Sequence, residues 1–327
     1  MQSIKPDDDH FHPRSDNPYW NESAWFSFFI PERNIDGWLY VWHRPNMNLS
    51  AGGVAIWDGS GTNSHDCLYY SFEPFNPMPD GADMFDFELA NGLRFHLDEP
   101  LKSYDVGFKG DGCEMDLHFD AVMPVQGMRF GDHTETGMEV WGNGHYDQAG
   151  RMRGTITIQG ERYDVDCIAN RDHSWGPREW GQSWNRGGYE FANSPDGTMS
   201  LLMLALTHVP SADDPFVGTT EPLTYGWFRK DDQISKLVSG ERRVVERGPD
   251  GRPLRLIINA RDDLGREIEA EGRLENVLNY HASFFAYWGL MTWTINGELA
   301  WGETQDCFRP EEIRLLIRAL REQAATT

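Results

Sequence analysis

The stretch F-D-F-E-L-A-N-G-L-R-F-H-L, residues 85–97, decides the fold class of this chain. Apolar side chains occupy every second position on both sides of Asn91-Gly92, namely Phe85, Phe87, Leu89, Leu93, Phe95 and Leu97. This alternation is typical of strands that have one buried and one solvated face. Because Asn-Gly favours a two-residue type I′ turn, the stretch predicts an antiparallel β-hairpin.

The same period of two continues along most of the chain. It returns at residues 115–121, 156–158 and 163–167. In the second half, turn-like sequences separate further strand-like runs at residues 195–198, 248–252, 262–265 and 296–297. Turns at such spacing are typical of an all-β sandwich or barrel. A barrel of about eight strands can hold one small ligand, but a sandwich with a filled core fits the periodicity equally well.

One helix and two domains are expected. The pattern R-P-E-E-I-R-L-L-I-R-A-L-R at 309–321 predicts a helix over 310–321, whose apolar face packs across a sheet. A length of 327 residues suits two domains of roughly 100–200 residues. Because W-N-R-G-G at 184–188 interrupts the strand pattern, we expect an N-terminal extension over 1–19, a first domain over 20–184 and a second domain over 185–327.

The charge of the chain excludes several classes of partner. Its 29 Lys and Arg against 52 Asp and Glu give a formal net charge of -23, which repels nucleic acid and anionic lipid. The first residues have no apolar signal region, and no run approaches the ~18 apolar residues of a membrane span, so we expect a cytoplasmic protein without membrane insertion. Oligomeric state is not specified. The scattered cysteines are expected to be free thiols: Cys67, Cys113, Cys167 and Cys307.

The stretch A-N-R-D-H-S-W-G-P-R, residues 169–178, contains many polar and charged side chains directly after a strand-like run. Together with E-S-A-W-F-S-F-F at 22–29, P-E-R at 31–33 and W-H-R-P at 42–45, it resembles the carotenoid 1,2-hydratase (hydroxyneurosporene synthase) superfamily. Members commonly carry Asp-His-Glu-Trp where this chain has Asp-His-Ser-Trp, so Ser174 puts the role of that Glu in doubt.

The resemblance implies a fold and a type of reaction. The implied fold is two lipocalin-like antiparallel barrels or half-barrels in tandem, with the C-terminal helix added. Better understood relatives hydrate, isomerise or cyclise unsaturated, often isoprenoid, molecules. Protonating an alkene needs a strong acid, and burial can keep a carboxyl protonated near neutral pH.

Asp172 matches the position of the family's catalytic Asp and is the expected acid, with His173 as its partner. Adjacent strand residues face opposite ways, so both enter one cavity only if the backbone turns, as Gly176-Pro177 would allow. The competing interpretation is a buried structural corner, because Arg171 or Arg178 close to Asp172 would lower its pKa and make it a poor acid.

Aromatic side chains are the expected substrate-binding residues, since indole and phenol faces stabilise a developing cation. The candidates are Trp175, Trp184, Tyr225, Trp227 and Trp288, although most aromatic residues in β proteins belong to the core. Glu303 is the candidate for directing water, against the alternative of a solvent-facing strand residue.

No cofactor and no metal are expected. Motifs for dinucleotides, P-loops and hydrolase elbows are absent, and His10-x-His12 lacks further spaced ligands, so we interpret it as a solvated end. The leading hypothesis is an enzyme that acts by acid catalysis on an alkene in a hydrophobic terpenoid or steroid-like molecule. The alternatives are a carrier that binds such a molecule unchanged, and a pericyclase whose cavity holds a polyene in a reactive shape.

Overall fold

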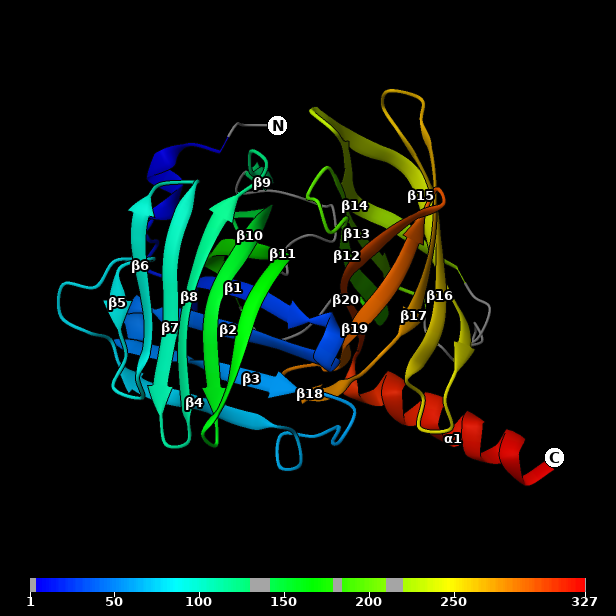
Figure 1. The fold of residues 1–327 in the computed structure, drawn as a ribbon, viewed down its shortest axis with the longest axis horizontal. Helices are drawn as coiled ribbons and strands as arrows, with labels where there is room; N and C mark the ends of the chain where they lie inside the picture. Colours follow the sequence, from blue (N-terminus) through cyan, green and yellow to red (C-terminus); the bar gives the residue numbers. More distant parts are fainter. Residues whose placement is uncertain (1–3, 130–141, 179–183, 210–219, 327) are drawn as a thin grey trace. The chain divides into compact units, whose positions relative to one another are not determined.

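The chain forms two compact units in a computed structural model that describes residues 4–129, 142–178, 184–209 and 220–326. The first unit contains Met1–Ser60 and His65–Trp180, and the second contains Gly61–Ser64 and Gly181–Thr327. Apart from three short 3-10 turns and one helix, the regular structure within the described residues is antiparallel β-sheet (Figure 1). The prediction of an all-β protein with a C-terminal helix is confirmed.

The first unit is an open half-barrel. Its sheet runs in the order β4-β3-β2-β1-β11-β10-β8-β7-β6-β5, with β9 paired to β10 (Figure 1). The strands are β1 Trp20–Ile30, β2 Ile35–Arg44, β3 Leu49–Trp57, β4 Tyr69–Pro77, β5 Phe87–Glu88, β6 Leu93–Glu99, β7 Ser103–Gly110, β8 Cys113–Ala121, β9 Gln126–Arg129, β10 Gly144–Ile158 and β11 Glu161–Pro177. The 3-10 turns are η1 Pro6–Asp9, η2 Pro31–Arg33 and η3 Pro45–Met47.

The predicted hairpin at residues 85–97 forms, but its turn differs from the prediction. Leu89 and Leu93 close a loop of three residues, and only Gly92 of the Asn91-Gly92 pair has a positive φ, 89°. A type I′ turn needs positive φ at both central residues, so the expected turn type is wrong. The extra residue is accommodated because Gly92, which has no Cβ, adopts this conformation without strain.

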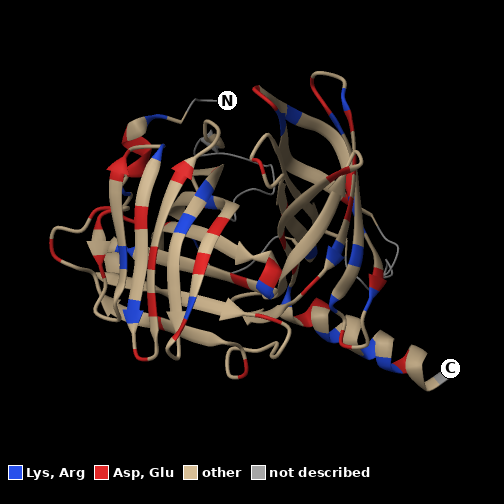
Figure 2. Cartoon of the chain, in the orientation of Figure 1, with Lys and Arg blue, Asp and Glu red and all other residues tan. Residues whose placement is uncertain are grey.

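The core of the half-barrel is aromatic. Phe26 of β1 lies at its centre and makes edge or tilted ring contacts with Phe85, Phe95, Tyr104 and Phe119, at centroid separations of 5.2–6.1 Å. Rings at such angles and distances pack favourably. We call the face of the sheet that carries Phe26 the inner face and the opposite face the outer face. Acidic residues recur along the ribbon of β8 (Figure 2).

The second unit is a closed eight-stranded barrel. Its strands follow the order β17-β16-β15-β14-β13-β12-β20-β19, and pairing of β17 with β19 closes the ring, while β18 pairs with β19. They are β12 Arg186–Asn193, β13 Met199–Thr207, β14 Thr220–Lys230, β15 Gln233–Arg247, β16 Pro253–Asp262, β17 Glu267–Leu274, β18 Leu278–His281, β19 Phe285–Ile295 and β20 Glu298–Phe308. The closure supports the barrel interpretation over a sandwich.

The predicted helix is α1, Pro310–Thr326. Leu316 is buried against Phe285, Tyr287 and Phe308, which belong to β19 and β20 of the same unit. The helix therefore packs across a sheet, as its single apolar face predicted. No helix in the described ranges has the length and apolarity that crossing a membrane requires.

Candidate functional site

The motif residues Asp172 and His173 lie on opposite faces of the half-barrel. β11 continues as a strand through Gly176-Pro177, so the backbone does not make the expected turn. In the register, His173 pairs with Ala24 and Tyr146, whereas Asp172 pairs with Trp25 and Asp147. Because paired residues of antiparallel strands share a face, the motif contributes to two separate clusters.

The inner-face cluster is built around His173, which has no exposed surface. Its Nδ1–H donates a hydrogen bond of 2.9 Å to the backbone carbonyl of Ser23. Its Nε2 lies 3.7 Å from Oε2 of Glu22 and has no hydrogen-bond partner among the described residues. Burial lowers the pKa of His173 well below its usual range, so the ring is neutral and Nε2 carries a lone pair.

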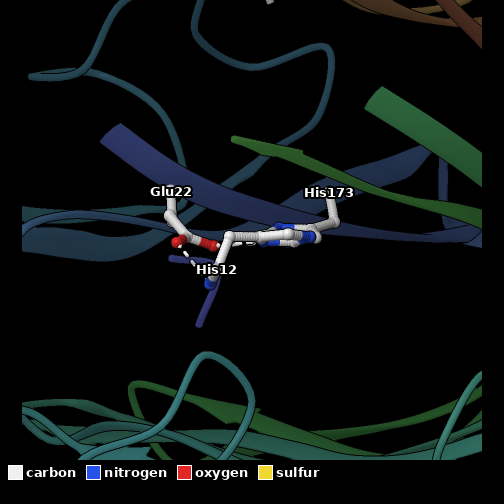
Figure 3. Close-up of side chains that lie close together, drawn as sticks. All are labelled: His12, Glu22 and His173. Atoms are coloured by element: carbon white, nitrogen blue, oxygen red, sulfur yellow. Dashed lines mark hydrogen bonds and ion pairs between the residues drawn. The ribbon is translucent and has the colours of Figure 1, made fainter. Parts of the chain in front are cut away.

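Glu22 of β1 connects His173 to the N-terminal segment (Figure 3). Its Oε1 accepts hydrogen bonds from the backbone N–H of His12, at 2.8 Å, and from Nε1–H of Trp20, at 3.3 Å. Its Oε2 lies 3.0 Å from Nδ1 of His12. Burial raises the pKa of this carboxyl, although its contacts with His12 oppose the shift.

His12 is not part of a solvated end, so that interpretation is wrong. Its side chain is only 11% exposed, and its ring stacks on the indole of Trp175 with centroids 4.0 Å apart. Asp8 and Asp9 of the same segment are also buried. Only His10 fits the expectation, with nearly half of its side chain exposed beside Asp83. An isolated H-F-H sequence carries no signal that distinguishes these two histidines.

Arg171 lies on the inner face and is paired away from Asp172. Its guanidinium lies 3.5 Å from a carboxylate oxygen of Asp9 and 4.2 Å from the ring centroid of Tyr104. Tyr104 in turn donates a hydrogen bond of 2.5 Å to Asp9. This contact explains why Arg171 does not form the salt-bridged corner with Asp172 that the competing interpretation required.

The outer-face cluster joins Asp172 to a hydrogen-bonded chain formed by Ser174, His145 and Asp147. His145 Nε2–H donates to Asp147 at 3.1 Å, and the Ser174 hydroxyl donates to His145 Nδ1 at 2.8 Å. Asp172 keeps some exposed surface, yet burial of its carboxyl raises its pKa to about 7. The opposing effects of His145, Arg178 and Arg171 are smaller. Ser174, at the position of the usual Glu, thus contacts an imidazole.

The structure distributes the predicted aromatic residues over both units. Trp175 joins His12 at the inner face, while Trp184 of the second unit packs against Phe284. Trp288 donates its Nε1–H to Glu303, which is fully buried, so the solvent-facing alternative for Glu303 is wrong.

The other predicted side chains of the second unit point away from the barrel interior. Tyr225 and Trp227 alternate with Phe228, a member of the barrel core. By the same alternation, Trp288 and Glu303 face away from the core residues of β19 and β20. These side chains therefore do not line the interior of the second barrel.

A buried charge network fills part of the interior of the second barrel. Arg242 of β15 contacts Glu190 at 2.5 Å, Glu221 at 2.5 Å and Asp306 at 2.9 Å, and Arg247 contacts Asp306 at 2.6 Å. Each of these groups is 4% exposed or less. The network was missed from the sequence, because its members come from four separate strands.

A pocket of about 770 Å³ opens in the first unit beside the inner-face cluster. Its lining is largely apolar and includes Ile4, Leu101, Met123 and Val125, with Lys102 as its charged member. Three of these residues, Ile4, Leu101 and Val125, also pack against Trp20, Tyr146 and Trp175. The lining of the pocket is therefore in contact with the aromatic cluster that includes Trp175, the residue on which His12 stacks.

Comparisons with known proteins show the family and the fold. The family model described as a domain of unknown function, DUF7064, matches residues 5–307, and the chain belongs to this family. No curated protein sequence matches the chain. Among solved structures, it is similar to a protein of Nitrosomonas europaea described as a candidate AttH, with 13% identity and a TM-score of 0.59 over 94% of this chain and 97% of that one.

Two further solved structures are similar in fold. Kievitone hydratase from Nectria haematococca has 13% identity and a TM-score of 0.54, over 88% of this chain and 89% of the other. CghA, also solved with Sch210972, has 12% identity and a TM-score of 0.55, over 89% of each chain. The tandem lipocalin-like fold implied by the sequence resemblance is thus confirmed; at this identity the likeness concerns the fold alone.

Proposed function

We propose that this member of the DUF7064 family catalyses the acid-dependent hydration, isomerisation or cyclisation of an alkene in an apolar, terpenoid or steroid-like molecule. The observation that carries the proposal is geometric: Asp172 shares the outer face with His145, Asp147 and Ser174. One carboxylate oxygen each of Asp172 and Asp147 and one ring nitrogen of His145 lie within 4.8 Å of one another. A proton donor and a proton acceptor are therefore within reach of one substrate.

Each residue of the outer-face cluster has a role in this proposal. Asp172 donates its proton to one alkene carbon, leaving a carbocation at the other. Trp25 is the register partner of Asp172, and Tyr40 is the register partner of Trp25, so aromatic rings share the face on which the cation forms. Asp147 holds the His145 ring, whose Nδ1 takes up a proton through the Ser174 hydroxyl.

The atom that gives up the proton accepted by His145 decides the product. If water attacks the cation and then loses a proton, the net change is hydration. If the adjacent carbon loses the proton, the double bond moves and no water is added. If a second double bond of the substrate attacks the cation first, a ring forms and the new cation then loses a proton to His145 through Ser174. Asp172 regains its proton from solvent in each case, so atoms and charge balance.

The comparisons support the type of reaction in this proposal, but they do not identify the substrate. A neighbour of the same fold is named as a hydratase, and the D-H-S-W-G motif resembles that of the carotenoid 1,2-hydratase superfamily. The partner that we propose is therefore a hydrophobic small molecule. Fold likeness alone does not transfer a reaction, so the proposal depends on the outer-face cluster.

The test is incubation with pooled terpenoid and steroid alkenes in deuterated water, followed by mass spectrometry of the products. Deuterium bound to carbon is expected with the unchanged chain and is expected to be lost with Asp172→Asn. Asp164→Asn is the matched control, because Asp164 lies on the same strand and the same face but is exposed. Full activity of the Asp172→Asn variant would contradict the proposal.

The pocket of about 770 Å³ favours a second candidate function, the carriage of an apolar molecule. Its volume and largely apolar lining suit a small apolar molecule. In this case native mass spectrometry detects a retained, unchanged ligand without deuterium. Replacing Leu101 or Met123 by a charged residue then weakens retention, while Asp172→Asn leaves it intact.

A further inference from the structure

The inner-face cluster presents two imidazoles and one carboxylate to a common point. One ligand atom from each of His12, Glu22 and His173 lies within 4.8 Å of the other two (Figure 3). Nitrogen and oxygen donors in this two-His, one-carboxylate combination are a usual set for divalent transition metals. The arrangement differs from an acidic surface patch because Glu22 and His173 are at most 1% exposed.

His173 is held with its lone pair pointing into the cluster. Its Nδ1–H is committed to the carbonyl of Ser23, which leaves Nε2 as a buried acceptor. Among the described residues, no donor reaches this Nε2. A buried polar atom without a partner is unfavourable, and a metal ion bound there removes the cost. Metal-binding histidines typically donate their other N–H to a carbonyl or carboxylate in this way.

Glu22 offers one oxygen to the same point. Two N–H groups, from the His12 backbone and the Trp20 indole, already donate to Oε1. Oε2 instead faces both imidazoles, 3.0 Å from His12 Nδ1 and 3.7 Å from His173 Nε2. Ligand atoms each about 2.1 Å from one ion lie about 3.0 Å apart at right angles and about 3.4 Å apart in a tetrahedron. The two observed separations bracket the tetrahedral value.

His12 completes the set and has its own supporting carboxylate. Its Nε2 lies 3.2 Å from Oδ1 of Asp8, so a proton on Nε2 is accepted by Asp8 and Nδ1 is left facing Glu22. Nδ1 of His12 and Oε2 of Glu22, 3.0 Å apart, therefore share either a hydrogen atom or a metal ion. Stacking of His12 on Trp175 holds the ring in this orientation.

We propose that His12, Glu22 and His173 bind one divalent first-row transition-metal ion, with Ser23 and Asp8 orienting the two imidazoles. Two donors come from strands of the half-barrel and one from the N-terminal segment. A bound ion therefore links that segment to the half-barrel. The site lies on the face of β11 opposite to Asp172, so it is independent of the function proposed above.

The first experiment measures binding on the full-length chain, freed of any affinity tag and stripped with a chelator. Calorimetric titration with Zn²⁺ is expected to show one ion per chain. His12→Gln, Glu22→Gln and His173→Gln are each expected to weaken binding by at least about 100-fold, because even orienting residues cost 10- to 100-fold. His10→Gln is the matched control, two residues away and exposed, and is expected to leave affinity unchanged.

A second measurement does not depend on variants that fold poorly. With Co²⁺ in the unchanged protein, proton NMR is expected to show two strongly shifted, exchangeable imidazole N–H signals, one from His12 and one from His173. Three results would overturn the proposal: no binding by the unchanged protein, binding by the three variants as tight as that of the unchanged protein, or loss of binding only in Asp147→Asn. The last result would place the ion in the outer-face group of His145, Asp147 and Asp172.

Discussion

The imidazole of His12 stacks on the indole of Trp175, with the two ring planes only 7° apart. A residue of the N-terminal segment thereby packs against the last residues of β11, at the opposite end of the first unit's sequence. Within the segment that looked like a charged, solvated end, Asp8 and Asp9 are buried and His12 is nearly so, whereas Lys5, Asp7 and His10 are exposed.

We expect His12→Ala to lower the free energy of unfolding of the first unit by about 2 kcal/mol in the presence of a chelator. The change removes the ring stacking and leaves the buried Glu22 carboxylate without its imidazole partner. Urea unfolding followed by tryptophan fluorescence measures the effect. His10→Ala, whose side chain is exposed, should change stability by less than about 0.5 kcal/mol. Equal effects of the two substitutions would contradict the packing described for His12.

We expect Gly144→Ala to displace Trp175. A Cβ at position 144 would lie 2.1 Å from Cζ2 of that indole, which is closer than any van der Waals contact. Overpacking of this kind costs about 1–3 kcal/mol, and the emission of Trp175 should change with its surroundings. Gly59→Ala is the control, since its nearest neighbour is Nδ2 of Asn34 at 3.3 Å. An unchanged fluorescence spectrum in Gly144→Ala would count against this prediction.

We expect Arg242→Met to destabilise the second unit by about 3–5 kcal/mol. Removing the guanidinium leaves the buried carboxylates of Glu190, Glu221 and Asp306 facing one another. Arg255→Met provides the comparison, because its pair with Glu271 is about one-third exposed and contributes about 0–1 kcal/mol. Thermal and urea unfolding of both variants measure the difference, and similar losses in the two would argue against the central role of Arg242.

We expect Glu190 to make the stability of the second unit fall as pH rises. Burial raises the pKa of its carboxyl from 4.5 to about 7, even though Arg242 opposes the shift. Between these values the folded protein holds a proton that the unfolded chain has released, so stability is lost as pH rises from about 4.5 to about 7. Glu190→Gln should weaken this dependence in urea unfolding measured from pH 5 to 8. An identical pH dependence in the variant would mean that Glu190 is ionised throughout.

The outer-face cluster could be predicted in part. The motif at residues 171–176 directed attention to Asp172, and alternation along G-H-Y-D at 144–147 puts His145 and Asp147 on one face of a strand. What the sequence did not contain was the pairing of β10 with β11 in the register that places Asp147 opposite Asp172. Consequently His145, and not His173, became the neighbour of the proposed acid.

The sequence by itself determined the strands, their buried faces and the C-terminal helix. Alternation at residues 115–121 assigned Met115, Leu117 and Phe119 to the interior of β8, where all three are buried. Such assignments succeed because side-chain direction along a strand follows from local backbone geometry, which needs no knowledge of the partner strands.

Only the tertiary structure decided which side chains meet. The contact of His12 with His173, and those of Arg242 with Glu190 and Asp306, join segments that lie far apart in the sequence. Their encounter depends on strand order and register, which are set by the packing of the whole unit and not by any local pattern. The fold class was therefore readable from the sequence, whereas the two polar clusters of the half-barrel required the folded chain.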